Sequence, residues 1–579
     1  MRIDRAWADV CSGTLFDTSL RPVSCLIASL VALSPGCALV DALSAIEAHD
    51  AGADPCLDIP VCGGDPDSGT QPMQPDAAPL TSDVGPDLSV AVGDVVQLDG
   101  SQSSGALTYL WELSAPEESS ASLSNTDAAQ TSFVADLEGV YEATLWVYDG
   151  GFGYAVDEVT ITARVIFGSA GPDRSTYTGT GVTLGEIAGE PTGRSVAYSW
   201  TILSTPSGSK AVLNDPTIAT PVLVPDQDGR YQLQLVVSDD GVDEAPDVVQ
   251  VTSYRPIVRL EHRVVDAEYS RGLGRLVMVA EQPNRLYILD PATGIETSAN
   301  LGPAPTAVAV SPAGAHAAVA HDGWVTRVNL TSRAVVRHPV EFSLADIVMA
   351  TDDSAFAMTA FDSYDGLRCL NLSSGEDARA VDDWMFHTGG AHLKLHPSTG
   401  RIYAANNGVS PADIGRFDVA SGMATYRYDS PYHGEHSMCG NLWISDDGAR
   451  IFTACGAMFR TSDLRANDME YNGSLPGVLY IRHLDHSSTA RKIVVLPSDD
   501  VVGGDRNSRK TIRIYDASDP LSLDRQIELP HFLDAGADHP AYGRFSFISA
   551  DDTKVFVIIQ ADERSGLLND HALVTYDLN

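Results

Sequence analysis

Alternation of apolar and polar residues runs through most of the chain and predicts a protein built from β-strands. One segment places Tyr141, Ala143, Leu145 and Val147 at every second position. A period of two is that of a strand with one buried face. The pattern therefore predicts an all-β fold.

Residues 81–256 contain an internal repeat. The tripeptide at 85–87 (Gly-Pro-Asp) recurs at 171–173, and Tyr109 and Trp111 recur as Tyr198 and Trp200. Asp136, Gly139, Tyr141, Leu145, Val147 and Asp149 recur 90 residues later as Asp226, Gly229, Tyr231, Leu235, Val237 and Asp239. About ninety residues of short strands, with a Trp and a Tyr to anchor the core, make a β-sandwich. The repeat predicts two sandwiches, at 81–163 and 164–256.

The framework of Tyr109-Leu110-Trp111, Tyr141 and Asp149 resembles that of the PKD (polycystic kidney disease) family, and both repeats carry it. Members of that family are Ig-like domains found outside cells in tandem arrays. The resemblance implies a spacer or a binder of protein or carbohydrate, and it implies no chemistry.

Residues 257–579 show a second pattern, in which paired strands recur seven times. The second strand of each unit is predicted to begin near Arg275, His316, Ser354, Arg401, Arg450, Arg491 and Lys554. The 323 residues divide into seven units of about 46, which is near the length of a four-stranded propeller blade. Residues 401–408 (Arg-Ile-Tyr-Ala-Ala-Asn-Asn-Gly) resemble the YVTN family of propeller repeats. The sequence predicts a seven-bladed β-propeller.

The two ends of this region predict how the ring closes. Residues 572–577 fit the third strand of blade seven, and the chain ends at Asn579 without a fourth. The segment from Ile257 to Arg263 precedes blade one and can supply that strand. Closure in this way removes exposed strand edges.

The N-terminus has the parts of a secretory signal. Arg21 precedes an apolar run from Val23 to Leu33, which is too short to span a bilayer. Gly36-Cys37 resembles the end of a bacterial lipoprotein signal, and this implies a signal peptide at 1–36 and a lipid on Cys37. The predicted location is the cell envelope, at the outer surface or in the periplasm. A cleaved signal on a secreted protein and an uncleaved anchor are the alternatives.

Residues 37–80 are rich in Asp, Pro, Gly and Ala without an apolar period, which predicts an acidic, disordered tether. Cys56 and Cys62 lie within it, and an oxidising compartment favours a local disulfide over metal binding by two thiols. Cys439 and Cys455 flank the turn from Ser445 to Ala449 at equal distance. They are predicted to form a cross-strand disulfide, with Cys369 free in a blade core.

Charge excludes one class of partner. The chain has 37 basic and 78 acidic residues, a formal net charge of −41, and residues 22–163 contain no Lys or Arg. Such a surface repels phosphate backbones and anionic headgroups, so nucleic acid is excluded and membrane contact is expected only through the lipid anchor. The acidic residues are expected to form a solvated face, with calcium binding as the alternative.

Candidate ligand-binding residues gather in the segments that join one blade to the next. In a propeller these segments open on the same face as the loops between second and third strands, and long loops of that kind fall at Asn406–Asp413, Asp499–Arg509 and Asp562–Asp570. That face is predicted to bind ligand, whereas the tight turns at 311–314 and 445–448 form the opposite face. The candidates are Trp384, His387, His392, His433, His436 and His539.

No nucleophile elbow, P-loop, dinucleotide-binding glycine pattern or His-Glu-x-x-His motif occurs in the chain, so no catalytic residue is assigned. No cofactor is expected, and the alternatives are calcium held by acidic residues or a transition metal held by the histidines.

The sequence favours an exported, lipid-anchored surface binding or adhesion protein over an enzyme. In this interpretation the PKD-like modules are a spacer and the propeller is the head that binds an extracellular protein or glycan. The alternative is a propeller hydrolase or oxidoreductase with a histidine-containing site at the channel mouth. Convergence of His392, His436 and His539 would favour the enzyme.

Overall fold

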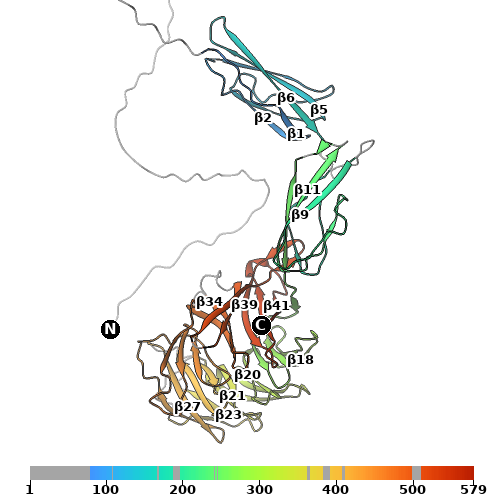
Figure 1. Ribbon diagram of the computed structural model, residues 1–579. Coiled ribbons are helices and arrows are strands. Elements are labelled where there is room, and N and C mark those ends of the chain that lie inside the picture. The colour runs from blue at the N-terminus through green and yellow to red at the C-terminus, as the bar shows by residue number, and fades with distance from the viewer. Residues whose placement is uncertain are drawn as a thin grey trace, which may run out of the picture. The chain divides into compact units, whose positions relative to one another are not determined.

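The computed structural model describes residues 79–579, except 107, 166–167, 187–195, 240–241, 244, 361–365, 383–390, 407–410, 499–509 and 519. These residues form an all-β protein of two Ig-like sandwiches followed by a seven-bladed propeller (Figure 1). A short 3-10 turn, η3 (Glu563–Ser565), lies in the last blade. Within the described ranges, no helix is long and apolar enough to cross a membrane.

The first sandwich packs a four-stranded sheet, in the order β1-β6-β5-β3, against the two-stranded sheet of β2 and β4. Trp111 is buried in its core, and its Nε1 donates to the Ala128 carbonyl over 2.9 Å. The Tyr141 hydroxyl donates to Asp136 Oδ1 over 3.0 Å. The strands are β1 (Leu88–Ala91), β2 (Val95–Asp99), β3 (Thr108–Ser114), β4 (Gln130–Val134), β5 (Gly139–Tyr148) and β6 (Tyr154–Arg164).

The second sandwich repeats this arrangement, with β11 paired to both β9 and β13 and with β8 paired to β10. Trp200 Nε1 donates to the Ile218 carbonyl over 3.1 Å, and the Tyr231 hydroxyl donates to Asp226 Oδ1 over 3.1 Å. The Trp and Tyr of each repeat are therefore core anchors, as expected. The strands are β7 (Arg174–Tyr177), β8 (Val182–Thr183), β9 (Val196–Ser204), β10 (Val222–Leu223), β11 (Gly229–Asp239), β12 (Val242–Asp243) and β13 (Asp247–Tyr254).

Blades 1 to 3 of the propeller begin at Val264. Two long strands each supply two strands of the blades. The first half of β20 is the second strand of blade 2, and its second half is the third strand. β21 begins as the last strand of blade 2 and continues as the first strand of blade 3. The strands are β15 (Val264–Ser270), β16 (Arg275–Ala280), β17 (Arg285–Leu289), β18 (Glu296–Asn300), β19 (Pro305–Val310), β20 (His316–Asn329), β21 (Val335–Met349), β22 (Ser354–Thr359), β23 (Leu367–Asn371) and β24 (Asp377–Arg379).

Blades 4 to 6 are separate four-stranded antiparallel sheets, and a small hairpin of β37 and β38 follows blade 6. The strands are β25 (His392–Leu395), β26 (Arg401–Asn406), β27 (Asp413–Ala420), β28 (Met423–Asp429), β29 (Leu442–Ile444), β30 (Arg450–Thr453), β31 (Ala457–Arg460), β32 (Tyr471–Ser474), β33 (Tyr480–Ser487), β34 (Lys492–Ser498), β35 (Thr511–Asp516), β36 (Ser522–Glu528), β37 (Phe532–Asp534) and β38 (Ala537–His539).

Blade 7 joins the two ends of the propeller region. It consists of β39 (Ala541–Ile548), β40 (Lys554–Ala561) and β41 (His571–Asp577), completed by β14 (Val258–Leu260). Val258 pairs with Leu573 in an antiparallel ladder, so the expected closing strand is confirmed. The ring is thereby held by backbone hydrogen bonds between segments more than 300 residues apart.

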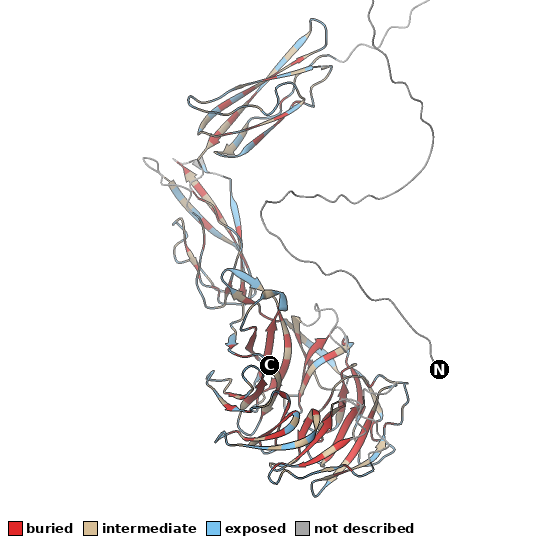
Figure 2. Cartoon of the chain, turned by 180° about the vertical axis from the view of Figure 1, so that it is seen from behind, coloured by how far each residue is buried: buried red, intermediate tan, exposed pale blue. Residues whose placement is uncertain are grey.

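The hydrophobic core of the propeller lies between neighbouring blades. One buried cluster joins blades 7 and 1 and contains Leu276, Met278, Phe545 and Ile558. Six comparable clusters fill the remaining junctions between blades. Figure 2 shows buried residues concentrated along the propeller strands. Because apolar packing holds the blades to each other, the innermost strands are left to line a channel.

Candidate functional site: the propeller channel

A cavity of about 290 Å³ lies in the propeller channel, and residues from all seven blades line it. The innermost strands supply alternate residues, for example Asp266 and Glu268 from β15 and His392 and Lys394 from β25. This follows from the strand period of two, because every second side chain faces the channel. Charged side chains are thus placed inside the ring.

A β-bulge in the innermost strand of five blades adds a second set of lining residues. The pairing register shifts by one residue in blades 1, 2, 3, 6 and 7, and in each case the residue passed over lines the cavity. Such bulges re-aim a side chain without disturbing the rest of the strand. We call these positions the bulge residues: Val265, Thr306, Ala345, Arg482 and Arg544.

Lys394 lies among three carboxylates in the channel. Its Nζ is 3.2 Å from Glu268 Oε1. Burial alone would lower the pKa of Lys394, but Glu268, Asp346 and Asp266 outweigh that effect and raise the pKa above its ordinary value. The ammonium group is therefore permanently charged and balances part of the acidic lining.

The acidic residues of the channel differ in their surroundings. Burial raises the pKa of Asp266 to about 7, although its Oδ2 accepts a hydrogen bond from the Val308 N–H at 2.8 Å. Burial also acts on Asp346, but His392 and Lys394 outweigh it and hold the pKa of that carboxyl below its usual value. Asp346 Oδ2 accepts from the Leu393 N–H at 2.7 Å and lies 3.6 Å from His392 Nδ1. At neutral pH Asp346 is ionised, whereas Asp266 is partly protonated.

His483 is a neutral hydrogen-bonding group on the channel wall. Burial, with Lys394 and Arg482 nearby, lowers its pKa to about 3. The Ser546 N–H lies 3.3 Å from His483 Nδ1, so Nδ1 accepts and the proton is assigned to Nε2. The ring packs edge-on against Trp443 and Phe545, at centroid distances of 5.9 and 5.6 Å.

Trp443 lines the cavity beside His483 and is only 5% exposed. Its Nε1–H is buried and has no hydrogen-bond partner among the described residues. Buried donors are normally paired, and an unpaired one is costly. Trp443 also packs in the cluster between blades 5 and 6, and its Nε1 atom is closed off from the cavity.

Arg544 is held at the cavity by a chain of hydrogen bonds in blade 7. Its guanidinium donates to Gln560 Oε1 over 2.7 Å, and Gln560 Nε2 donates to Asp570 Oδ2 over 2.8 Å. Asp570 Oδ1 in turn bonds His571 Nδ1 at 2.8 Å. Gln560 and Asp570 are buried, so these contacts fix the guanidinium at the cavity.

The structure divides the candidates chosen from the sequence. His392 lines the channel cavity. His433 is exposed in the loop before blade 5, and the neighbouring His436 ring stacks on Tyr471 at a centroid distance of 3.7 Å. The predicted signal peptide and nearly all of the predicted tether lie outside the described residues, as do Trp384, His387, Cys37, Cys56 and Cys62.

His539 belongs to the hairpin of β37 and β38 after blade 6. At the start of the same hairpin, the His531 ring stacks on Tyr254 at a centroid distance of 4.5 Å, and the His531 carbonyl accepts from the Tyr177 hydroxyl over 3.2 Å. Tyr177 and Tyr254 come from the second sandwich. The segment of this hairpin therefore contacts the second sandwich of the same chain.

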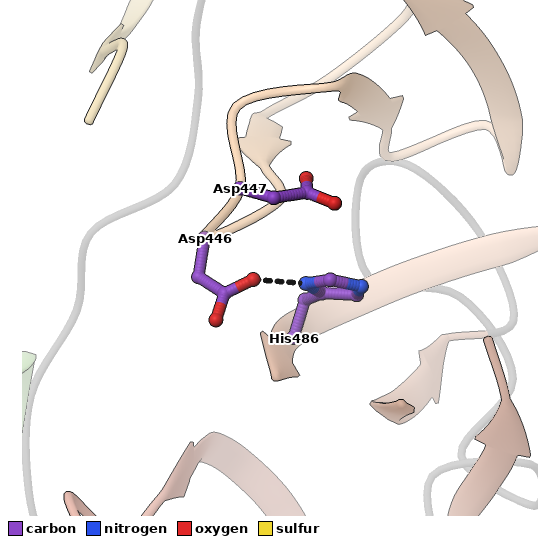
Figure 3. A group of neighbouring side chains, drawn as sticks. All are labelled: Asp446, Asp447 and His486. Carbon is purple, nitrogen blue, oxygen red and sulfur yellow. Dashed lines mark hydrogen bonds and ion pairs between the residues drawn. The ribbon is translucent and has the colours of Figure 1, made fainter. Parts of the chain in front are cut away.

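His392, His436 and His539 do not form a shared metal-binding group. In the part of the chain that the structure describes, the one group with metal-ligand spacing is Asp446, Asp447 and His486 (Figure 3). It lies at the turn between β29 and β30, on the face expected to offer only tight turns. Asp446 accepts from His486 Nδ1 at 2.6 Å and from the Ser488 N–H at 2.9 Å, so it ties blade 5 to blade 6.

A disulfide joins Cys439 and Cys455, whose Cα atoms are 5.5 Å apart, and Cys369 is a buried cysteine that takes no part in that bond. The register differs from the symmetric turn assumed from the sequence. Leu442 pairs with Thr453, and continuing that ladder places Cys455 opposite Gly440 instead of Cys439. The bond therefore joins residues just beyond the ends of β29 and β30.

Sequence reasoning missed the charged residues that line the channel, although a signal was present. Asp266, Glu268 and Lys394 are charges within otherwise apolar first strands of blades, and charges at such positions are rarely structural fillers. The bulge residues carry no comparable signal, because one extra residue in a strand does not change its composition.

Comparison with known proteins identifies the first sandwich. Residues 84–163 match a family model that describes a PKD domain. PKD domains are typical of extracellular proteins. No curated protein matches the sequence of the chain.

Two solved structures are similar to part of the chain. One is the β-propeller domain of Cps50 (Swd1) from Myceliophteria thermophila, with 11% identity and a TM-score of 0.42 over 56% of this chain and 99% of that one. The other is hydrazine synthase from Kuenenia stuttgartiensis, with 15% identity and a TM-score of 0.37 over 56% of this chain and 98% of that one.

Proposed function

We propose that the chain is an exported surface binding protein in which the propeller is the ligand-binding head and the two sandwiches are a spacer. The ligand is an extracellular protein or glycan that inserts a polar group into the channel. The PKD match at 84–163 supports an extracellular role for the protein.

The observation that carries the proposal is the composition of the cavity. It combines cationic, anionic and aromatic side chains from different blades around about 290 Å³. Convergent polar groups fix the orientation of a ligand in a binding site, and polar side chains make up most of the lining of this cavity. These features support a binding site in the channel, and among the described candidates from the sequence His392 contributes to its lining.

The enzymatic alternative has weaker support. Ser546 Oγ lies 3.5 Å from His483 Nδ1, which is the kind of neighbour a nucleophile needs. However, a histidine with a pKa of about 3 is a poor general base at neutral pH. Asp266, with a pKa of about 7, is better matched to proton transfer, but a reaction would also need a nucleophile beside it.

We further propose that Cys37 carries the lipid that anchors the protein to the cell envelope, with residues 38–80 as a tether. Radiolabelled palmitate should enter the wild-type chain and should not enter the Cys37→Ala variant. Equal labelling of both chains would exclude lipidation at this residue and favour a secreted protein.

Binding itself is tested by probing glycan and extracellular-protein arrays with the full chain and with a Lys394→Met variant. We expect the variant to lose binding to whatever the wild type captures, because Lys394 lies inside the channel. The matched control is Lys554→Met, whose exposed ion pair with Asp577 joins β40 to β41 in blade 7. Retention of binding by Lys394→Met would remove the channel from the proposal.

A further inference from the structure

We infer that the outward face of the first sandwich is a docking surface for a basic segment of a partner protein, in which Lys or Arg side chains alternate with apolar ones. The proposed function assigns binding to the propeller, so this inference adds a second and separate site. It is carried by an exposed group of aromatic residues, by the carboxylates beside them, and by a comparison with the second sandwich.

Large apolar side chains gather on the outward face of the sheet that contains β5 and β6 (Figure 1). Trp146 in β5 pairs with Leu110 in β3 and with Val156 in β6. In the next row on the same face, Tyr148 pairs with Tyr154. Side chains two residues apart on a strand point to the same side, so these residues form one surface. We call it the aromatic face: Leu110, Trp146, Tyr148, Tyr154 and Val156.

The aromatic face is open to solvent. Tyr154 is 62% exposed and Val156 is 48% exposed. The rings of Trp146 and Tyr154 lie side by side, with a centroid distance of 5.6 Å. Phe152, in the turn that joins β5 to β6, is fully exposed. Contiguous exposed apolar residues mark interaction sites on soluble proteins, and aromatic side chains are enriched in protein interfaces.

The second sandwich shows that the fold does not require the aromatic face. Aromatic pairs across strands can serve to stabilise a sheet. However, β9 and β11 of the second sandwich pair in the same register as β3 and β5, around the same core anchors, and their outward side chains are smaller. The aromatic residues are therefore an addition to the fold. The residues at the positions of Leu110, Trp146 and Tyr148 are Ser199, Val236 and Ser238.

The charge beside the aromatic face favours a cationic partner. Glu112 of β3 and Glu158 of β6 lie in the row next to that of Trp146, on the same side of the sheet. Both are exposed, and neither has a hydrogen-bond or ion-pair partner among the described residues. Residues 22–163 contain no Lys or Arg, and Arg164 lies at the end of β6 remote from the aromatic face. A Lys or Arg side chain can pair with such a carboxylate and lie over an adjacent aromatic ring.

Other occupants use less of this surface. An anionic ligand would meet only negative charge beside the aromatic residues. A second copy of the chain has the same formal net charge of −41 and would be repelled. A neutral glycan could stack on the rings, but it would leave the charge of the carboxylates unbalanced. A basic protein segment uses both the aromatic and the acidic residues.

The inference is tested by isothermal titration of the full chain with an octapeptide of alternating Arg and Leu. The two control peptides replace Arg by Glu or Leu by Ser. Each control lacks one half of the recognition, so we expect each to bind at least roughly five-fold more weakly. Equal binding of either control, or no measurable binding of the Arg and Leu peptide, would overturn the inference.

An aromatic variant assigns the binding to this surface. Trp146→Val combined with Tyr148→Ser installs the residues that the second sandwich carries in the same fold, and it should weaken binding of the Arg and Leu peptide at least roughly five-fold. Tyr154→Ser alone changes an exposed side chain and should weaken binding roughly two-fold or more. The matched control is Val236→Ala at the equivalent position of the second sandwich, where affinity should not change. Unchanged affinity in the combined variant and in Tyr154→Ser would overturn the assignment.

A charge variant tests the role of the carboxylates. Glu112→Gln combined with Glu158→Gln should weaken binding of the Arg and Leu peptide roughly three-fold or more, because the ion pairs with Arg are lost. The matched control is Glu117→Gln combined with Glu118→Gln, which makes the same change of net charge at exposed positions after β3. Equal weakening in the two charge variants would show that only the overall charge of the chain attracts the peptide, and it would overturn the inference.

Two further measurements distinguish the occupant. Sedimentation equilibrium would assign the aromatic face to a second copy if the wild type forms a dimer that the combined aromatic variant does not form. A glycan array would assign it to a glycan if the same variant loses a glycan that the wild type captures. Either result would overturn the basic segment as the partner. None of these experiments involves the channel, so failure of the proposed function and failure of this inference are separate outcomes.

Discussion

Lys394 in blade 4 and Glu268 in blade 1 form an ion pair across the propeller channel. The Nζ–Oε1 distance is 3.2 Å, although the two residues are 126 positions apart in the sequence. Two blades separate them on one side of the ring and three on the other. The pair therefore depends on correct closure of the whole propeller.

We predict that Lys394→Met destabilises the propeller by about 1–2 kcal/mol. Removing one partner of a fully buried pair costs about 3–5 kcal/mol, but cavity solvent reaches these side chains, which are 28% and 34% exposed. The measurement is chemical unfolding of the full chain. Lys554→Met is again the control, and its exposed pair should cost no more than about 0.5 kcal/mol. Equal losses of unfolding free energy in the two variants would show that the channel pair stabilises the fold no more than an exposed ion pair does.

We predict that the stability of Asp266→Asn relative to the wild type improves as pH rises. The pKa of Asp266 is about 7 in the folded chain and about 3.8 when unfolded, so the folded state holds the extra proton between these values. Its contribution to the free energy of unfolding therefore falls as pH rises from 4 to 7. Asparagine does not titrate and can still accept from the Val308 N–H.

Melting temperatures of the two proteins at pH 5 and pH 8 test this prediction. The carboxyl faces Lys394, Glu268 and Asp346, and all three are retained in the variant, so their titration largely cancels in the comparison. Asp346→Asn should behave oppositely: the depressed pKa of Asp346 stabilises the fold above its unfolded pKa, and this contribution is lost on acidification. A difference between Asp266→Asn and wild type that is independent of pH would contradict the raised pKa.

We predict that Leu260→Ala destabilises the propeller by about 2–5 kcal/mol, the usual cost of truncating a buried leucine. Leu260 in the closing strand β14 is 3% exposed and packs in the cluster between blades 7 and 1. Val258→Ala in the same strand is the control, because Val258 is 48% exposed. Scanning calorimetry of the full chain should show a large shift for the first variant only. Similar shifts would argue against closure through β14.

We predict that the disulfide of Cys439 and Cys455 contributes up to about 3 kcal/mol, the value for a closed loop of this size. Mass spectrometry of the unreduced, alkylated protein should find both residues unmodified. Under denaturing conditions Cys369 should be alkylated, which gives an internal positive control. Alkylation of Cys439 and Cys455 would show that they are not joined.

The blade pattern could be read from the sequence because turn residues and strand alternation are local properties. Six second strands begin at the predicted residue, for example β22 at Ser354 and β40 at Lys554, and β34 begins one residue after Arg491. The two sandwiches could be predicted from the sequence equally well, because the Trp and Tyr anchors recur at nearly constant spacing. Local alternation and repetition were sufficient for the fold class.

The candidate site was less accessible because it depends on residues that meet around the ring. Histidines such as His436 stand out in the sequence as reactive residues in loops, yet this one stacks on Tyr471. Lys394 and Glu268 form an ion pair only in the closed ring, where blades 1 and 4 bring the two side chains together. The disulfide register failed for a related reason, because a turn centred one half-residue away from Asp447 moves every pair beyond it.

The five β-bulges separate two tasks that a propeller strand otherwise has to combine. The alternating residues of each innermost strand bind neighbouring blades and face the channel, so changing them alters the packing of the ring. A bulge residue lies outside that alternation, so its replacement leaves the pairing ladder in place. Val265 also packs against the cluster between blades 1 and 2, and the Thr306 hydroxyl donates to the Leu344 carbonyl of blade 3. Ala345, Arg482 and Arg544 are therefore the bulge positions at which single substitutions would change the channel lining with least effect on the scaffold.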